Sequence, residues 1–177
     1  QNSSPVLRFD GGDYLSADAL ASEFATSNPP ITIGIVANVS NTVSYRALMM
    51  FGADASTSYF IGLYASNIAQ WRYVARGITL REIVGGTANA TYNIVVTRSS
   101  GTVGQLFVNG AQVGVDTDFT ANPPLTNFKV GAWKHVSLQD YHMGDIAEIV
   151  IYNRALSMAE RGALEFYLAA KWGIALA

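Results

Sequence analysis

The sequence contains no cysteine and carries little charge. Asp, Glu, Lys and Arg make up 14% of its 177 residues, against about 25% in an average soluble protein. The missing cysteine excludes disulfide scaffolds, thiolate zinc sites, iron–sulfur clusters and cysteine nucleophiles. A net charge of −2 disfavours binding to backbone phosphates, so we expect no nucleic-acid partner. No apolar run approaches the roughly 18 residues of a membrane span, so we expect none.

Alternation of apolar and polar residues dominates the chain and is typical of β-strands. In residues 31–40 every second residue is apolar, which predicts a half-buried strand, and residues 91–98 repeat the pattern. Residues 143–152 are apolar at odd and even positions alike, which predicts a central strand covered on both faces. Further strands are expected at residues 6–9, 14–17, 46–51, 59–64, 68–75, 79–84, 103–108, 111–115 and 128–132.

Turn residues separate these strands at intervals of roughly 8–12 residues, which suits a sandwich or barrel. Asn109-Gly110 predicts a type I′ hairpin turn, because both central residues of that turn need positive φ. The segment Asn28-Pro29-Pro30 recurs as Asn122-Pro123-Pro124. Since proline cannot donate to a sheet ladder, each pair is expected where a strand begins.

One helix is expected, at about residues 157–172. Ser157 and Glu160 have the spacing of a capping box, and Gly173 is placed to end the helix in the left-handed conformation. We expect the helix to pack on the sandwich through its apolar stripe, which includes Leu164, Leu168 and Trp172.

From residues 7–15 at the start to residues 167–173 at the end, several segments resemble, in order, parts of the laminin-G-like and concanavalin-A-like jelly-roll domains, especially bacterial and phage members. Residues 7–15 (LRFDGGDYL) resemble the opening strand pair, and residues 92–98 and 104–110 resemble the central hairpin. Residues 144–157 (GDIAEIVIYNRALS) resemble the closing segment, and residues 167–173 the final helix. The resemblance implies an all-β, antiparallel two-sheet jelly-roll sandwich with one C-terminal α-helix, formed by a single domain of residues 1–177.

The sequence disfavours catalysis. Jelly-roll glucanases place carboxylates at alternating positions of one strand, whereas Asp145 and Glu148 are three residues apart and are expected on opposite faces. We therefore expect no enzyme. Glu148 is interpreted as a structural carboxylate, hydrogen-bonded to a backbone amide or to Arg154. Where the family's closing segment has Asp and Arg, this chain has Ala147 and Val150.

An aromatic, polar loop at residues 133–142 is the candidate ligand site. Sugar sites combine an aromatic face with fixed polar groups, and this loop supplies both kinds of side chain. The residues assigned to ligand binding are Trp133, His135, Tyr141 and His142.

Residues 71–73 (Trp-Arg-Tyr) offer a second patch with the same chemistry. Trp71 and Tyr73 point to the same face of a predicted strand, so we favour the interpretation that both side chains fill the core.

Calcium is an open alternative as a cofactor, and we assign it no ligand. Two acidic groups have oxygen ligands to offer, but solvated loop carboxylates are commoner than ligands. The groups are Asp116 with Asp118, and Asp10 with Asp13 and Asp18.

These observations favour a non-catalytic binding module that recognises carbohydrate or a cell-surface partner. The alternative is a structural subunit or decoration protein of a virion or extracellular filament, with homo- or hetero-oligomeric contacts. A glycoside hydrolase is the third and least favoured alternative. Each of the first two implies an extracellular or virion-associated location. Antiparallel sheets usually protect their edges with charged residues, above all lysine, and this chain has only three lysines. The scarcity of charge indicates an outer surface suited to contact with other molecules.

Overall fold

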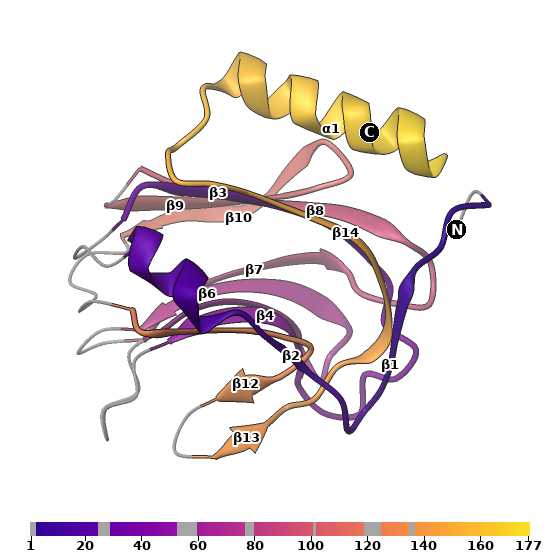
Figure 1. Ribbon diagram of the computed structural model, residues 1–177. Helices are drawn as coiled ribbons and strands as arrows, with labels where there is room; N and C mark the ends of the chain where they lie inside the picture. The colour runs from indigo at the N-terminus through magenta and orange to yellow at the C-terminus, as the bar shows by residue number, and fades with distance from the viewer. Residues whose placement is uncertain are drawn as a thin grey trace.

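The computed structural model describes residues 3–24, 29–52, 60–76, 80–100, 102–118, 125–134 and 137–177. Within these residues the chain forms two six-stranded antiparallel sheets that stack face to face (Figure 1). The first sheet has the order β1 (Leu7–Asp10), β14 (Met143–Tyr152), β3 (Ile31–Ala37), β8 (Asn93–Ser99), β9 (Val103–Val108) and β10 (Ala111–Asp118). The second has the order β2 (Leu15–Ser16), β11 (Asn127–Val130), β4 (Arg46–Gly52), β5 (Phe60–Ala65), β6 (Gln70–Arg76) and β7 (Leu80–Thr87). The expected two-sheet jelly-roll sandwich is confirmed.

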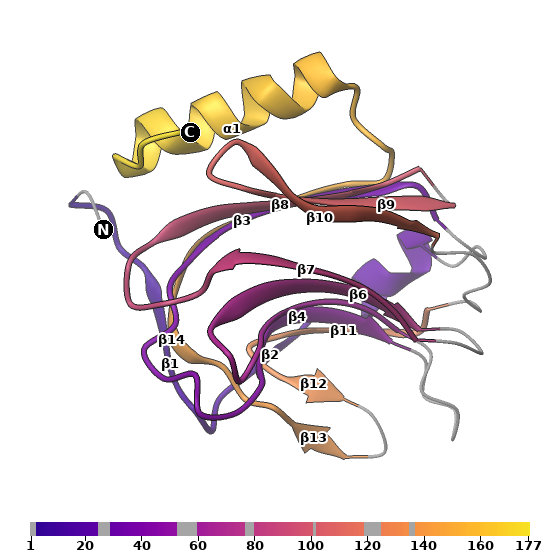
Figure 2. The ribbon, with the colours of Figure 1, turned by 180° about the vertical axis from the view of Figure 1, so that it is seen from behind.

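Three smaller elements complete the fold. The helix α1 (Met158–Trp172) lies on the outer side of the first sheet. A two-stranded hairpin, β12 (Trp133–Lys134) with β13 (Leu138–Gln139), lies on the outer side of the second (Figure 2). A 3-10 helix, η1 (Asp18–Phe24), packs near β11. Neither η1 nor the hairpin was predicted. Within the described part of the chain, no helix is both long and apolar enough to cross a membrane.

The main core fills the space between the sheets and follows the period-2 alternation of each strand. On β6 the inward side chains Trp71 and Tyr73 are fully buried. They meet residues of the opposite sheet such as Ile33, Ile35 and Val95 in one continuous apolar cluster. Burial of an aliphatic or aromatic side chain contributes about 1.5–3 kcal/mol, so this cluster dominates the stability of the sandwich.

Strand β3 corrects one prediction. It was expected to be half-buried, with a polar outer face, but all seven of its residues are buried. The reason is α1, which covers the outer face of the first sheet. A side chain on Gly34 would meet Leu164 of the helix, because a Cβ there lies only 3.2 Å from Leu164 Cδ2. Glycine in the middle of β3 therefore lets helix and sheet approach closely.

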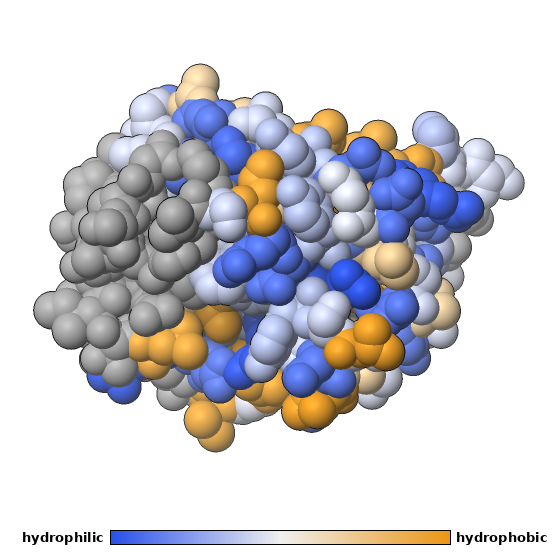
Figure 3. All heavy atoms as spheres, turned by 90° about the horizontal axis from the view of Figure 1, so that it is seen from below, coloured by the Kyte–Doolittle hydropathy of each residue, from blue (hydrophilic) through white to orange (hydrophobic). Residues whose placement is uncertain are grey.

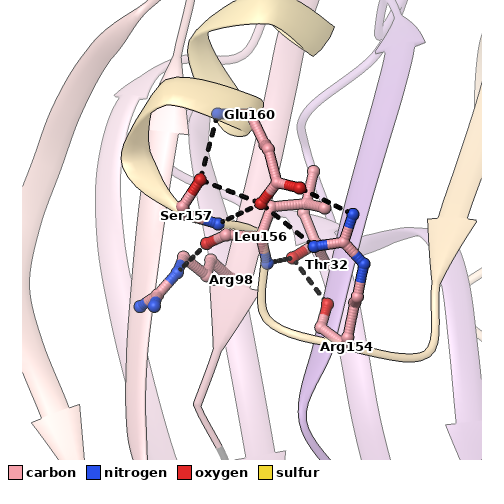
Figure 4. Close-up of polar contacts among 6 residues, drawn as sticks. All are labelled: Thr32, Arg98, Arg154, Leu156, Ser157 and Glu160. Atoms are coloured by element: carbon pink, nitrogen blue, oxygen red, sulfur yellow. Dashed lines mark hydrogen bonds and ion pairs between the residues drawn. The ribbon is translucent and has the colours of Figure 1, made fainter.

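The chain between β14 and α1 is fastened by polar contacts (Figure 4). The hydroxyl of Thr32 on β3 donates to the carbonyl of Arg154 at 3.0 Å and accepts from the amide of Leu156 at 2.9 Å. Arg98 Nε donates to the Leu156 carbonyl at 2.6 Å. A polar side chain on a buried strand is thus satisfied by backbone groups, and it fixes where the helix begins.

Both ends of α1 are as predicted. Ser157 and Glu160 form a capping box, in which each side chain accepts from the other residue's amide. Gly173 ends the helix with φ of 66°, in the left-handed region that favours glycine. Leu164, Leu168 and Trp172 are buried in a second apolar cluster under the helix.

The tight turn at Asn109-Gly110 is also confirmed, with φ of 49° and 91°. Pro29 and Pro30 directly precede β3, as expected, whereas Asn28 lies outside the described residues. The second Asn-Pro-Pro segment, at residues 122–124, lies outside the described residues.

A β-bulge in β14 corrects the orientation expected for its carboxylates. The pairing with β3 shifts register between Ile146 and Glu148. The extra residue brings Glu148 to the helix side of the sheet, which is also the side of Asp145. The two residues therefore share a face, although simple alternation predicted opposite faces.

Glu148 is a structural carboxylate, but its partners are not those predicted. It accepts from Trp172 Nε1 at 2.5 Å, from the Tyr167 hydroxyl at 3.0 Å and from Lys171 Nζ at 3.1 Å. Arg154 instead pairs with Glu160. Burial acts to raise the pKa of Glu148, yet the hydrogen bonds from the helix outweigh it and hold that pKa below its ordinary value.

We expect Glu148→Ala to lower the free energy of unfolding by about 1–3 kcal/mol, because three donors of α1 lose their shared acceptor. Thermal unfolding would show this as a melting temperature lower by roughly 2–4 °C per kcal/mol. A depressed carboxylate pKa stabilises the fold above its unfolded value of 4.5, and that gain is lost as pH falls through the folded value. The difference between the two proteins should therefore shrink below pH 4.5.

Glu23→Ala, at an exposed position of η1, is the control for removing a carboxylate. A melting temperature for Glu148→Ala equal to that of this control would contradict the structural role.

Candidate functional site

A hollow of about 270 Å³ opens on the outer face of the second sheet. It lies on the side of the molecule that carries β12 and β13, which Figure 3 views directly. Small hydrophobic areas are set among hydrophilic ones on this side. The hollow is lined by residues of four strands and two connecting segments: Tyr45, Tyr64, Arg72, Val74, Leu80, Glu82, Trp133 and Asp140.

Strand β6 supplies the floor of the hollow through its alternation. Trp71 and Tyr73 point into the main core with no exposed surface, as predicted. Arg72 and Val74, one residue further along in each case, point to the opposite face and line the hollow. The patch at residues 71–73 is therefore divided by the sheet, and only its central arginine reaches the site.

Arg72 is held by two neighbours within the hollow. Its guanidinium forms an ion pair with Glu82 on the adjacent strand β7. Nη1 donates to the hydroxyl of Tyr45 at 3.0 Å, and the guanidinium carbon lies 5.3 Å from the centre of the Tyr45 ring. The ion pair and the aromatic contact fix the arginine against the sheet.

Trp133 forms an aromatic wall of the hollow. Its ring meets that of Tyr64 edge to face, with centroids 5.9 Å apart and an interplanar angle of 81°. It packs on a small apolar cluster of the outer face that contains Ala47, Met50 and Val74 as well as Tyr64. Pairing of β12 with β13 holds the tryptophan in place. The wall is thus built on fixed elements, although sequence alone placed Trp133 in a loop.

Asp140 completes the rim directly after β13. Its backbone has φ of 52°, and its carbonyl accepts from the amide of Ala47 at 2.7 Å. Arg46 anchors the next residue by donating to the carbonyl of Tyr141 at 3.2 Å. Burial raises the pKa of Asp140, and the positive charge of Arg46 offsets part of the rise.

The four residues predicted to bind ligand do not form one site. Trp133 lines the hollow, and Tyr141 is half-buried next to Asp140. His135 lies outside the described residues. His142 has no exposed surface and packs edge to face on Phe9, 5.7 Å away. Burial lowers the pKa of His142 to about 4, so it is neutral at physiological pH.

The assignment of His142 to ligand contact is therefore corrected. A side chain without exposed surface cannot meet a ligand at this face. Sequence reasoning missed Tyr45, Tyr64, Glu82 and Asp140. The alternation along β6 and its pairing with β7 could have predicted that Glu82 lies near Arg72. Tyr45 and Asp140 lie in connecting segments, and no such pattern predicts their position.

Two of the acidic residues considered for calcium, Asp10 and Asp18, have other partners. Asp18 pairs with the buried Lys129 at 2.5 Å and accepts from the amide of Phe128. Asp10 accepts from the amide of Gly12. Among the described residues, no group of three His, Asp or Glu side chains is placed to hold a metal ion. The side chains of residues 116–118 lie outside the description.

Asp145 and Glu148 are distant from the hollow, since both lie on the helix side of the first sheet. Arg8 donates to both oxygens of Asp145, at 2.8 and 3.1 Å, and the Tyr92 hydroxyl donates at 2.7 Å. Glu148 is occupied by α1. Hydrogen bonds from Arg8, and secondarily from Tyr92, outweigh burial and lower the pKa of Asp145. Both carboxylates are therefore engaged in structural contacts.

A family model described as the Concanavalin A-like lectin/glucanases superfamily matches residues 9–160, and the chain belongs to this superfamily. No curated protein sequence is a significant match. The CBM40 module of the Ruminococcus gnavus IT-sialidase, bound to α2,3 sialyllactose, is similar with a TM-score of 0.75 and 15% identity. That alignment covers 92% of this chain and 97% of the module.

Larger sialidases contain a similar unit. The leech intramolecular trans-sialidase, complexed with 2,7-anhydro-Neu5Ac, gives a TM-score of 0.73 at 17% identity, over 88% of this chain and 26% of that one. NanB sialidase from Streptococcus pneumoniae gives 0.71 at 17% identity, over 88% and 26%. At such identities these likenesses establish the fold.

The three tryptophans should differ in their access to solvent. Trp71 and Trp172 are buried, and Trp133 is half-buried at the hollow. We expect Trp133→Phe to remove most of the acrylamide-quenchable fluorescence of the folded protein, because the two remaining indoles are shielded by the core and by α1. Equal quenching of the variant and the wild type would contradict this placement of Trp133.

Proposed function

We propose that this chain is a non-catalytic carbohydrate-binding module and that the hollow is its sugar site. The observation that carries the proposal is the combination of an aromatic wall, Trp133 with Tyr64, and fixed polar groups, Arg72, Glu82 and Asp140. Apolar C–H faces of a sugar pack on the aromatic wall, while its hydroxyls need hydrogen-bonding partners. The hollow offers both within one small volume.

Rigidity supports a binding role. Arg72 and Glu82 come from paired strands, and Arg72 is already held before any ligand arrives. A preorganised site loses little conformational entropy when it binds. The similarity in fold to a sialidase module solved with sialyllactose adds support for glycan recognition. We further propose an extracellular location, where such a module meets its ligand.

We propose no catalytic role because the carboxylates that could act as acid or nucleophile are already engaged in other contacts. A retaining glycosidase needs a free acid and a free nucleophile about 5–5.5 Å apart. Asp145 and Glu148 share a face because of the bulge, but Arg8, Tyr92 and α1 already occupy their oxygens. In the hollow, Glu82 is bound to Arg72. These contacts favour structural and binding roles for the acidic residues over proton transfer.

We expect Trp133→Ala to weaken glycan binding at least about tenfold, which corresponds to ~1.4 kcal/mol. Removing the ring deletes the apolar face of the hollow. Binding would be followed on an oligosaccharide array and then by calorimetry with the strongest neutral or acidic probe found. Because Trp133 packs on Tyr64, some loss of melting temperature is also expected. Binding must therefore be compared at a temperature where both proteins are folded.

Phe166→Ala is a matched control, since this aromatic is 70% exposed on α1, on the opposite side of the sandwich. It should bind glycans as the wild type does. An array signal that survives Trp133→Ala would remove the hollow from consideration.

A second candidate function, a structural subunit of an assembly, is favoured by one observation. On α1, Phe166, Met158 and Tyr167 leave 70%, 51% and 48% of their surface accessible. Large apolar side chains that remain exposed are candidate contacts for another molecule.

Light scattering coupled to size-exclusion chromatography separates the two candidates. A sugar-binding module predicts a monodisperse monomer, and assembly predicts a multimer that Phe166→Ala dissociates. A multimer that resists this substitution would contradict assembly through α1.

A further inference from the structure

The charges around the hollow are unequal. Among the lining residues that the structure describes, Arg72 is the one cation, whereas Glu82 and Asp140 are both carboxylic acids. With all three ionised these lining residues carry a net charge of −1; Arg46, whose charge acts on Asp140, lies outside the lining. An anionic ligand would enter a small, partly apolar space in which opposing charge is in deficit, and such a space screens charges less than bulk water does.

Arg72 is already paired with a carboxylate of the protein. Its ion pair with Glu82 neutralises it, Nη1 is engaged with the Tyr45 hydroxyl, and 18% of its side chain is exposed. A sugar carboxylate bound to the same guanidinium would have to displace Glu82 or lie beside it. In either case it would approach Glu82 and Asp140, and repulsion by these carboxylates opposes its binding.

The same arrangement suits an uncharged sugar. Glu82 has 36% of its side chain exposed, so acceptor positions face the hollow in addition to those used by Arg72. Asp140 adds further acceptors at the rim. Ionised carboxylates accept hydrogen bonds, and sugar hydroxyls donate them, whereas a sugar carboxylate has no proton to donate. The polar half of the hollow is therefore complementary to hydroxyl groups.

We infer that the hollow selects neutral sugars over acidic ones and that Glu82 is the residue that sets this preference. The inference rests on the proposed function and specifies its ligand class. Glu82 acts in two ways. It neutralises the guanidinium that would attract an acidic sugar, and it presents a negative charge that repels one. The fold shared with a module bound to sialyllactose does not decide the ligand, because Arg72, Glu82 and Tyr45 determine the electrostatics of this hollow.

The test compares wild type, Glu82→Gln and a control on an array that contains neutral, sialylated and uronic-acid oligosaccharides. Lactose and 3′-sialyllactose, which differ by one acidic sugar, are then compared by calorimetry, together with the strongest array probe. The wild type should bind neutral members and bind their acidic counterparts at least about tenfold more weakly. In Glu82→Gln the ratio of acidic to neutral affinity should rise about tenfold, because Arg72 keeps its charge while its anionic partner is lost.

Glu23→Gln makes the same change of net charge at an exposed position of η1, outside the lining of the hollow. It should leave the ratio unchanged, which separates a local effect from one of overall charge. High salt should reduce the shift seen in Glu82→Gln, since it screens the unpaired guanidinium.

The experiment distinguishes failure of the selectivity from failure of carbohydrate binding itself. A wild type that prefers acidic sugars, or a Glu82→Gln ratio equal to that of Glu23→Gln, would overturn the selectivity while leaving carbohydrate binding intact. A protein that binds no glycan of either kind would overturn the proposed function and the selectivity with it.

Discussion

The alternation of side chains along β6 is the constraint on which the candidate site depends. A strand in a sandwich must send every second side chain into the core, and β6 sends Trp71 and Tyr73 there. Arg72 is consequently forced to the opposite face, and the pairing of β6 with β7 brings Glu82 within reach of it. The packing that stabilises the sandwich therefore also positions the polar centre of the hollow. A shift of one residue in register would bury the arginine and expose both aromatic rings.

The low charge of the chain follows from covering both outer faces. In a simple sandwich the outer faces meet water and carry polar residues. Here α1 covers the first sheet, so Ala147 and Val150 of β14 pack in the cluster beneath the helix. The outer face of the second sheet carries its own small apolar cluster under Trp133. Much of the apolar excess is thus internal, covered by α1 on one side and by Trp133 on the other.

Local patterns predicted the fold well. The strands, the Asn109-Gly110 turn and the caps of α1 depend on neighbouring residues, so their signals lie within short segments of the sequence. The site depends on contacts between distant segments. The bulge near Glu148 is fixed by pairing with β3, and no residue near it in the sequence predicts it. Tyr45 and Asp140 meet Arg72 and Trp133 only after the sheet has formed. The burial of His142 against Phe9 likewise joins segments that are far apart in the sequence, although the neighbours of His142 in the sequence are those of a polar loop.

The pair of Arg72 and Glu82 illustrates how a contact can matter little for folding and much for recognition. Ion pairs with solvent access contribute about 0–1 kcal/mol to stability, because water would serve each charge almost as well. In a hollow that a ligand fills, that water is displaced, and the same charges must be satisfied by each other or by the ligand. A neutral sugar leaves the pair intact and uses its spare acceptors. A charged sugar competes with it. The preference of such a site is therefore set less by which charged residues line it than by whether those residues already satisfy one another.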